Sequence, residues 1–167
     1  YKIDDAVMHV VSAGGARTVN GVTFAREYDP LQNVSLLTIQ LPSTRKLYYV
    51  NPQVGVNRFG SASINYMGQN QMTKKWQRVE TYGGKLTENI VQAIARDALA
   101  LAIEHLEAAG LPVIFHIHDE CVIDCPAFGT PDEMLDHVTH LMTQPIPWAQ
   151  GLPLNADGWV GTFFKKD

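Results

Sequence analysis

Residues 86–110 have the sequence LTENIVQAIARDALALAIEHLEAAG, and this stretch decides much of the fold. Its apolar side chains recur at offsets of three and four residues, which is the period of a helix with one buried face. Thr87 can cap such a helix at its start, and Gly110 supplies a stop signal after its end. We therefore predict a helix from about Thr87 to Ala109, whose many alanines allow another backbone to approach closely.

The residues after this helix predict a β-hairpin. Two apolar runs, 113–117 and 121–125, flank the triplet His118-Asp119-Glu120. Short apolar runs rich in β-branched residues are typical of strands, and the polar triplet between them would form the turn. This turn is unusual because it contains no glycine.

The remaining elements are predicted from alternation, turn residues and helix-start signals. Their order is a short helix and loops over 1–30, a hairpin of strands 34–40 and 46–50 that ends before Asn51-Pro52, loop and edge strand over 51–75, a helix from Pro131 to about Met142, and a closing strand over 153–164. We expect an α+β fold in which one antiparallel sheet contains the triplet hairpin and the closing strand. The 87–109 helix would pack across one face of that sheet.

Composition limits the class of protein. The 167 residues, with 46% hydrophobic and 18% charged, are typical of one water-soluble globular domain. No run of about 18 apolar residues and no signal-peptide pattern occurs, so we expect a cytoplasmic protein without a membrane partner. The chain does not begin with Met, so we expect Tyr1 to be a cut end.

We predict that Cys121 and Cys125 are buried thiols, because their spacing suits neither a disulfide framework nor a zinc site.

Charge is distributed unevenly along the chain. Between residues 45 and 96 there are eight basic and two acidic residues, whereas residues 97–140 contain nine carboxylates and neither Lys nor Arg. The first block could follow a polyanion, and the second could attract a divalent cation. The alternative is two solvated surfaces of opposite sign.

The hairpin turn and a basic segment are the two stretches with chemical potential. Asp119 and Glu120 offer the oxygen ligands that Mg²⁺ prefers, although a two-metal site needs a further carboxylate from another strand. A solvated turn is the alternative, and a zinc site built on His116 and His118 lacks a third ligand at suitable spacing. Residues 74–85, KKWQRVETYGGK, interleave cations with aromatics as nucleic-acid contacts require, or form a basic loop with core aromatics.

The ordered set of these stretches resembles one known family. WQRVETYGGKLTENIVQAIARDALA, then FHIHDECVIDCP, then PIPWAQGLPLNADGW are similar to the C-terminal part of the family A DNA polymerases, the DNA polymerase I type, in their phage and prophage branch. The resemblance covers residue 31 to the C-terminus and is most specific over 76–126. It implies that residues 1–167 form a single partial domain, the C-terminal part of a polymerase palm. Within it, residues 1–30 are unassigned, 31–75 form a hairpin and loops, and 76–167 form the palm core.

The resemblance also implies roles for particular residues. Asp119 would bind the catalytic Mg²⁺ ions, and Glu120 would support the site without contacting them. His118 would lie against the primer terminus, and Gln92 would face the minor groove of the template-primer DNA. The family's Asn matches either Glu88 or Asn89. Arg78 and Lys85 are candidate contacts to the DNA backbone, with no family motif that matches them. The phage and prophage branch also implies the cytoplasm of a bacterium or of a phage-infected host.

Two family motifs have no counterpart in this sequence: the strand that ends in the other catalytic Asp, and the helix that binds the incoming triphosphate. The resemblance therefore implies a fragment of a DNA polymerase, which in the complete enzyme transfers a nucleotidyl group from a dNTP to a primer 3′-hydroxyl. We expect no primer extension by the isolated chain, because its partner would be the missing N-terminal polymerase part. The alternatives are a non-catalytic DNA-binding half of a split polymerase and a metal-dependent nuclease built on His116, His118 and Asp119.

Overall fold

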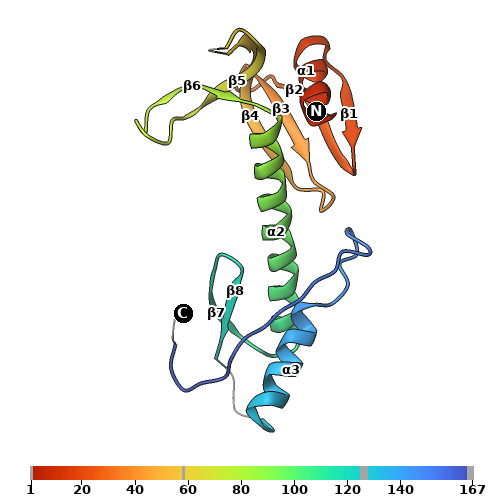
Figure 1. Ribbon diagram of the computed structural model, residues 1–167, viewed down its shortest axis with the longest axis vertical. Coiled ribbons are helices and arrows are strands. Elements are labelled where there is room, and N and C mark those ends of the chain that lie inside the picture. Colours follow the sequence, from red (N-terminus) through yellow and green to blue (C-terminus); the bar gives the residue numbers. More distant parts are fainter. Residues whose placement is uncertain (1, 58, 125–127, 165–167) are drawn as a thin grey trace. The chain divides into compact units, whose positions relative to one another are not determined.

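The computed structural model describes residues 2–57, 59–124 and 128–164. It has the α+β composition that the sequence predicts, with a six-stranded antiparallel sheet and three helices in the described part (Figure 1). The chain divides into two compact units, Tyr1–Ala93 and Ile94–Asp167. The expectation of a single partial domain stays a prediction.

The first unit is built on a sheet whose strands pair in chain order. Each strand is antiparallel to the next, so the sheet is a simple meander. The strands are β1 (Ala16–Val19), β2 (Val22–Asp29), β3 (Val34–Gln40), β4 (Lys46–Val56), β5 (Ala62–Gln69) and β6 (Trp76–Thr81).

One face of this sheet forms the core of the unit. Phe24 on β2 lies opposite Ile39 on β3, and Leu37 on β3 lies opposite Tyr49 on β4; all four side chains are buried. The helix α1 (Lys2–Ala13) packs on β1, β2 and β4, burying its valines. Because side chains alternate along a strand, the intervening residues face the opposite side, and most of them are partly exposed.

Three connections of the meander use the same local device. Asp29, Asn57 and Asn70 each accept hydrogen bonds on Oδ1 from backbone N–H groups two to four residues further on. The side-chain oxygen thereby accepts hydrogen bonds that a backbone carbonyl accepts in other turns, and this stabilises the bend of the chain. These turns are therefore specified locally.

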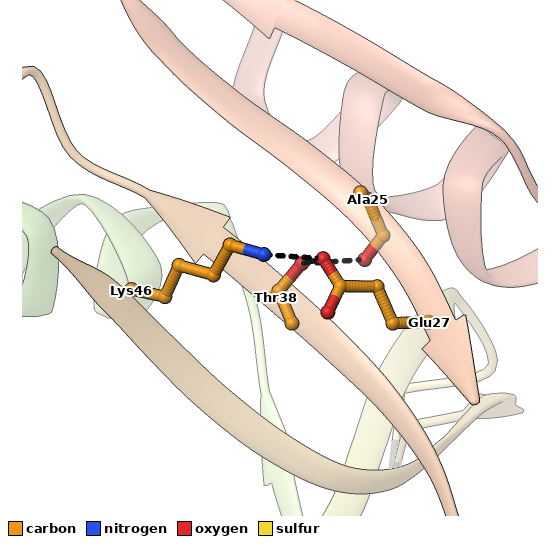
Figure 2. A network of polar contacts seen from close by, with 4 residues as sticks. All are labelled: Ala25, Glu27, Thr38 and Lys46. Carbon is orange, nitrogen blue, oxygen red and sulfur yellow. Dashed lines mark hydrogen bonds and ion pairs between the residues drawn. The ribbon is translucent and has the colours of Figure 1, made fainter. Parts of the chain in front are cut away.

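The opposite face of the sheet has a small polar network around Glu27 (Figure 2). Lys46 Nζ donates to Glu27 Oε1 at 2.7 Å, and the buried Thr38 hydroxyl donates to the same oxygen at 3.0 Å and to the Ala25 carbonyl at 3.4 Å. The hydrogen bond from Lys46 holds the pKa of Glu27 below its ordinary value. The pair is partly exposed, so its contribution to stability is small.

The second unit contains most of α2 (Gly83–Ala108), the hairpin of β7 (Val113–Ile117) and β8 (Glu120–Ile123), and α3 (Pro131–Met142). Among the described residues of this unit, the buried side chains are Leu99, Ala102, Leu106, Leu111 and Ile146. The helix α3 begins with Pro131 after a capping box between Thr130 and Glu133. The predicted bounds of this helix are confirmed, because proline and carboxylates mark its start as expected.

The long helix is confirmed but begins earlier than predicted. Thr87 is inside α2, where its hydroxyl donates to the Gly83 carbonyl instead of capping the helix. Asp4 of α1 accepts from the Gly83 N–H and so caps α2. A Cβ at Gly83 would collide with the Asp4 carboxylate, so a larger residue there would displace the side chain that caps the helix.

More residues of the first unit belong to strands than the sequence predicted. Residues 1–30 contain two strands as well as the helix, joined at Asn20-Gly21. The strand β4 does not end at Asn51-Pro52: Asn51 has φ of 49°, and a register shift between Val50 and Gln53 lets the strand continue. The strand β5 pairs on both sides and is therefore interior instead of an edge.

Two expectations about the sheet were wrong. The hairpin β7–β8 forms its own two-stranded sheet and is not part of the six-stranded one. The described residues 153–164 form no strand, since proline and two glycines interrupt the segment. The predicted packing of the long helix across the sheet also needs correction, because α2 contributes only residues 83–93 to the first unit and α1 packs on the sheet.

Candidate functional site

The predicted hairpin is present, and its turn consists of His118 and Asp119. Ile117 pairs with Glu120, so Glu120 begins β8 and does not belong to the turn. His118 has φ of 52°, in the left-handed region that glycine and asparagine usually occupy in such turns. The backbone therefore adopts a costly conformation at the residue beside Asp119.

The carboxylates at this turn have no partner among the described residues. His118, Asp119 and Glu120 are exposed, and their side chains form no hydrogen bond or ion pair in the described ranges. Their oxygens are thus available to a cation or to water. No group of three or more His, Cys, Asp or Glu side chains gathers into a metal-binding cluster in the part of the chain that the structure describes.

The other polar side chains of the hairpin do not form a second site. His116 lies opposite Cys121 and is exposed. Cys121 is half-buried, and burial raises the pKa of its thiol, which disfavours the nucleophilic thiolate. Cys121 is therefore less buried than predicted, and Cys125 lies outside the described residues.

The first turns of α2 bring several predicted DNA contacts together. Lys85 Nζ lies 2.9 Å from Glu88 Oε1, and Gln92 Nε2 donates to the same oxygen at 3.4 Å. All three side chains are exposed on one face of the helix. Lys85, Glu88 and Gln92 thus form one polar surface, which we call the helix-start cluster.

Asn89 points elsewhere. Its side-chain N–H donates to the Tyr49 hydroxyl at 3.0 Å, which ties α2 to the sheet. Burial raises the pKa of Tyr49, whose ring also makes an edge contact with Tyr66 at 4.9 Å between centroids. Nearby, Arg45 Nη2 donates to the Ala93 carbonyl at 2.8 Å and ties the same helix to the β3–β4 connection.

We expect the Asn89–Tyr49 hydrogen bond to be measurable as a coupling energy. In a cycle of Asn89→Ala, Tyr49→Phe and the double variant, urea unfolding of the first unit should show coupling of about 1 kcal/mol. Gln92→Ala is the control, since its exposed side chain should change unfolding by no more than about 0.5 kcal/mol. Full stability of Asn89→Ala, combined with loss of DNA binding, would instead place Asn89 in the DNA interface.

Arg78 also has a role within the sheet. Its guanidinium donates from Nη1 to the Asn51 carbonyl at 3.0 Å and to Asn65 Oδ1 at 2.6 Å. It therefore braces the irregular part of β4, a role that the sequence did not indicate. Both acceptors are neutral, so Arg78 keeps its positive charge on an exposed position.

Comparison with known proteins gives one informative match. The chain is 46% identical over 149 residues to a protein described as DNA polymerase from Bacillus phage SP02. The chain therefore corresponds to a segment of that phage polymerase. The match covers 89% of the chain but 22% of the phage polymerase, so most of that polymerase has no counterpart here.

The sequence-based resemblance to a DNA polymerase is thereby confirmed. No protein-family model matches the chain, and no solved structure matches it. No helix in the described ranges is both long and apolar enough to cross a membrane.

Proposed function

We propose that this DNA polymerase segment supplies the metal-binding hairpin of a polymerase palm of the family A type. The observation that carries the proposal is Asp119 in the turn of β7–β8, which is exposed and has no side-chain partner among the described residues. It lies within a chain that matches a phage DNA polymerase over most of the chain's length. In the complete enzyme the reaction would be transfer of a nucleotidyl group from a dNTP to a primer 3′-hydroxyl.

The donor set at the hairpin suits Mg²⁺. Asp119 presents carboxylate oxygens from a turn, and Glu120 stands next to it at the start of β8. Mg²⁺ takes one or two protein carboxylates and leaves its other positions to water and phosphates. Asp119 would hold the ion, which supplies charge stabilisation at the reacting phosphate, and Glu120 would support it. A second metal needs a carboxylate from elsewhere, since the described residues offer no larger cluster.

The DNA contacts would come from the other candidates. In the helix-start cluster, Gln92 would face the minor groove and Lys85 a backbone phosphate. His118 would lie against the primer terminus. Because Asn89 is bonded to Tyr49, the cluster's Glu88 is the one of the two family-Asn candidates that shares a face with Gln92.

Exposed apolar side chains support a larger polymerase as the setting. In the second unit, Ile114 and Phe115 on β7 and Phe163 near the C-terminus are exposed by 39% or more. Apolar surface of this kind is normally covered by another part of a protein. The occupant would be the polymerase part that carries the other catalytic Asp and the triphosphate-binding helix.

Primer extension tests this proposal. The purified chain should extend a labelled primer on a template no faster than a protein-free control, because one of two metal-binding carboxylate strands is absent. A polymerase that contains this segment should extend the primer when Mg²⁺ is present, and extension should stop when EDTA removes the ion. Robust extension by the isolated chain would contradict the proposal, as would metal-dependent plasmid nicking that disappears in His116→Ala. DNA binding without extension by the longer protein would favour a non-catalytic DNA-binding half.

A further inference from the structure

We propose that the open face of the six-stranded sheet binds single-stranded DNA, with Tyr48 and Trp76 stacking on bases and Lys74, Lys75 and Arg78 contacting phosphates. Its residues are different from those of the proposed metal-binding hairpin and of the helix-start cluster. The inference rests on the proposed function only because it takes DNA as the polymer that this surface binds.

The strand register places the two aromatic side chains on the same face. Val50, Met67 and Arg78 lie opposite one another across β4, β5 and β6. Tyr48 lies two residues before Val50, and Trp76 lies two residues before Arg78 on a strand that runs in the same direction. Since side chains alternate with a period of two, both rings stand beside this row, about 10 Å apart with β5 between them.

These rings are not part of the core. Tyr48 is 59% exposed and Trp76 is 63% exposed, whereas Tyr49, the next residue on β4, is 6% exposed. An unpaired base can stack on an exposed ring of a sheet face. Every base has an aromatic face, so this stacking does not depend on sequence. A duplex offers no unpaired base, so the aromatic pair favours single strands.

Three cationic side chains lie in or beside the part of β6 that carries Trp76. Lys74 and Lys75 are exposed in the connection before Trp76, which Asn70 holds through its Oδ1 bonds to backbone N–H groups. Neither lysine, nor Arg78, forms an ion pair within the described ranges of the chain. Glu80, two residues beyond Arg78 on the same face, is the nearest carboxylate along β6 and reduces the local charge.

The charge of the units fits this assignment. Residues 1–93 contain ten Lys or Arg against six Asp or Glu, whereas residues 94–167 contain three against eleven. In the absence of divalent cations, a polyanion is therefore attracted more strongly to the first unit than to the second. The sheet face has both the charge and the exposed rings that a single strand needs.

Fluorescence anisotropy with labelled oligothymidylate tests the proposal on the full chain. Tyr48→Ala and Trp76→Ala should each weaken binding about tenfold, and Trp76→Phe should retain most of it because a ring remains. Tyr28→Ala is the matched control, since Tyr28 is 62% exposed on the other face and its removal should leave affinity unchanged. Circular dichroism of each variant verifies folding.

Salt dependence separates phosphate contacts from stacking. Replacing Lys74 and Lys75 with alanine should reduce the slope of log affinity against log salt by about 1.4, because each phosphate contact to a single strand contributes about 0.7. Asp119→Asn should not change this binding, so failure here is distinct from failure of the polymerase proposal. Three results would overturn the inference: an equal loss of duplex affinity and single-strand affinity in Tyr48→Ala, an effect of Tyr28→Ala as large as that of Tyr48→Ala, or no binding to the oligonucleotide.

Discussion

Asp119→Asn in a polymerase that contains this segment should reduce primer extension by more than about a thousandfold. The change removes the charge from the carboxylate that we propose as a metal ligand, while it preserves the size of the side chain at an exposed turn. The fold should persist, because the Asp119 side chain is exposed and forms no hydrogen bond or ion pair with described residues. Steady-state extension rates with Mg²⁺ measure the loss.

Asp124→Asn is the matched control for this experiment. Asp124 is also exposed, but it follows β8 at the end away from the turn, and its backbone N–H bonds to the Pro112 carbonyl. Its variant should extend primers at a rate within about twofold of the parent's, since a distant surface charge contributes little. Equal losses for the two variants would mean that general charge, and not metal ligation, explains the effect.

Leu37→Ala should destabilise the first unit by about 2–5 kcal/mol in urea unfolding. Leu37 is fully buried on β3, opposite Tyr49 on β4. Its truncation removes apolar burial and leaves a cavity that a packed sheet cannot close completely. Because small domains are stable by only about 5–15 kcal/mol, a loss of this size should also lower the yield of folded protein.

Leu31→Ala is the same chemical change at an exposed site. Leu31 lies in the β2–β3 connection and is 95% exposed, so its truncation should change the free energy of unfolding by less than about 0.5 kcal/mol. If both variants were equally stable, the face with Phe24, Leu37 and Ile39 would not be the core.

The sequence predicted elements that local signals specify. Periodicity revealed the long helix, and Pro131 with its following carboxylates revealed α3 to its last residue. The β1–β2 hairpin was missed although Asn20-Gly21 is a strong two-residue turn signal, and both residues have positive φ. The extension of β4 could not be predicted, since Asn51-Pro52 normally ends a strand and here is absorbed by a register shift.

The candidate site was predictable where it depends on local geometry. The turn position of Asp119 follows from two short apolar runs, and helical spacing predicts that Glu88 and Gln92 share a face. Lys85 joins them because α2 begins at Gly83, earlier than predicted. The bond between Asn89 and Tyr49 joins residues forty positions apart, and that of Arg78 to Asn65 depends on which strands pair. A single sequence does not determine such pairings. The ion pair between Glu27 and Lys46 likewise depends on which strands pair.

The chain-order meander has a consequence for how the first unit folds. Every pairing in its sheet joins consecutive strands, and the polar side chains of Asp29, Asn57 and Asn70 stabilise three of the connections through local hydrogen bonds. Loop-closure entropy is small for such short connections, so each hairpin can form before the rest of the sheet is present. We therefore expect this sheet to assemble strand by strand during synthesis and to refold faster than a β-sheet of the same size with distant pairings.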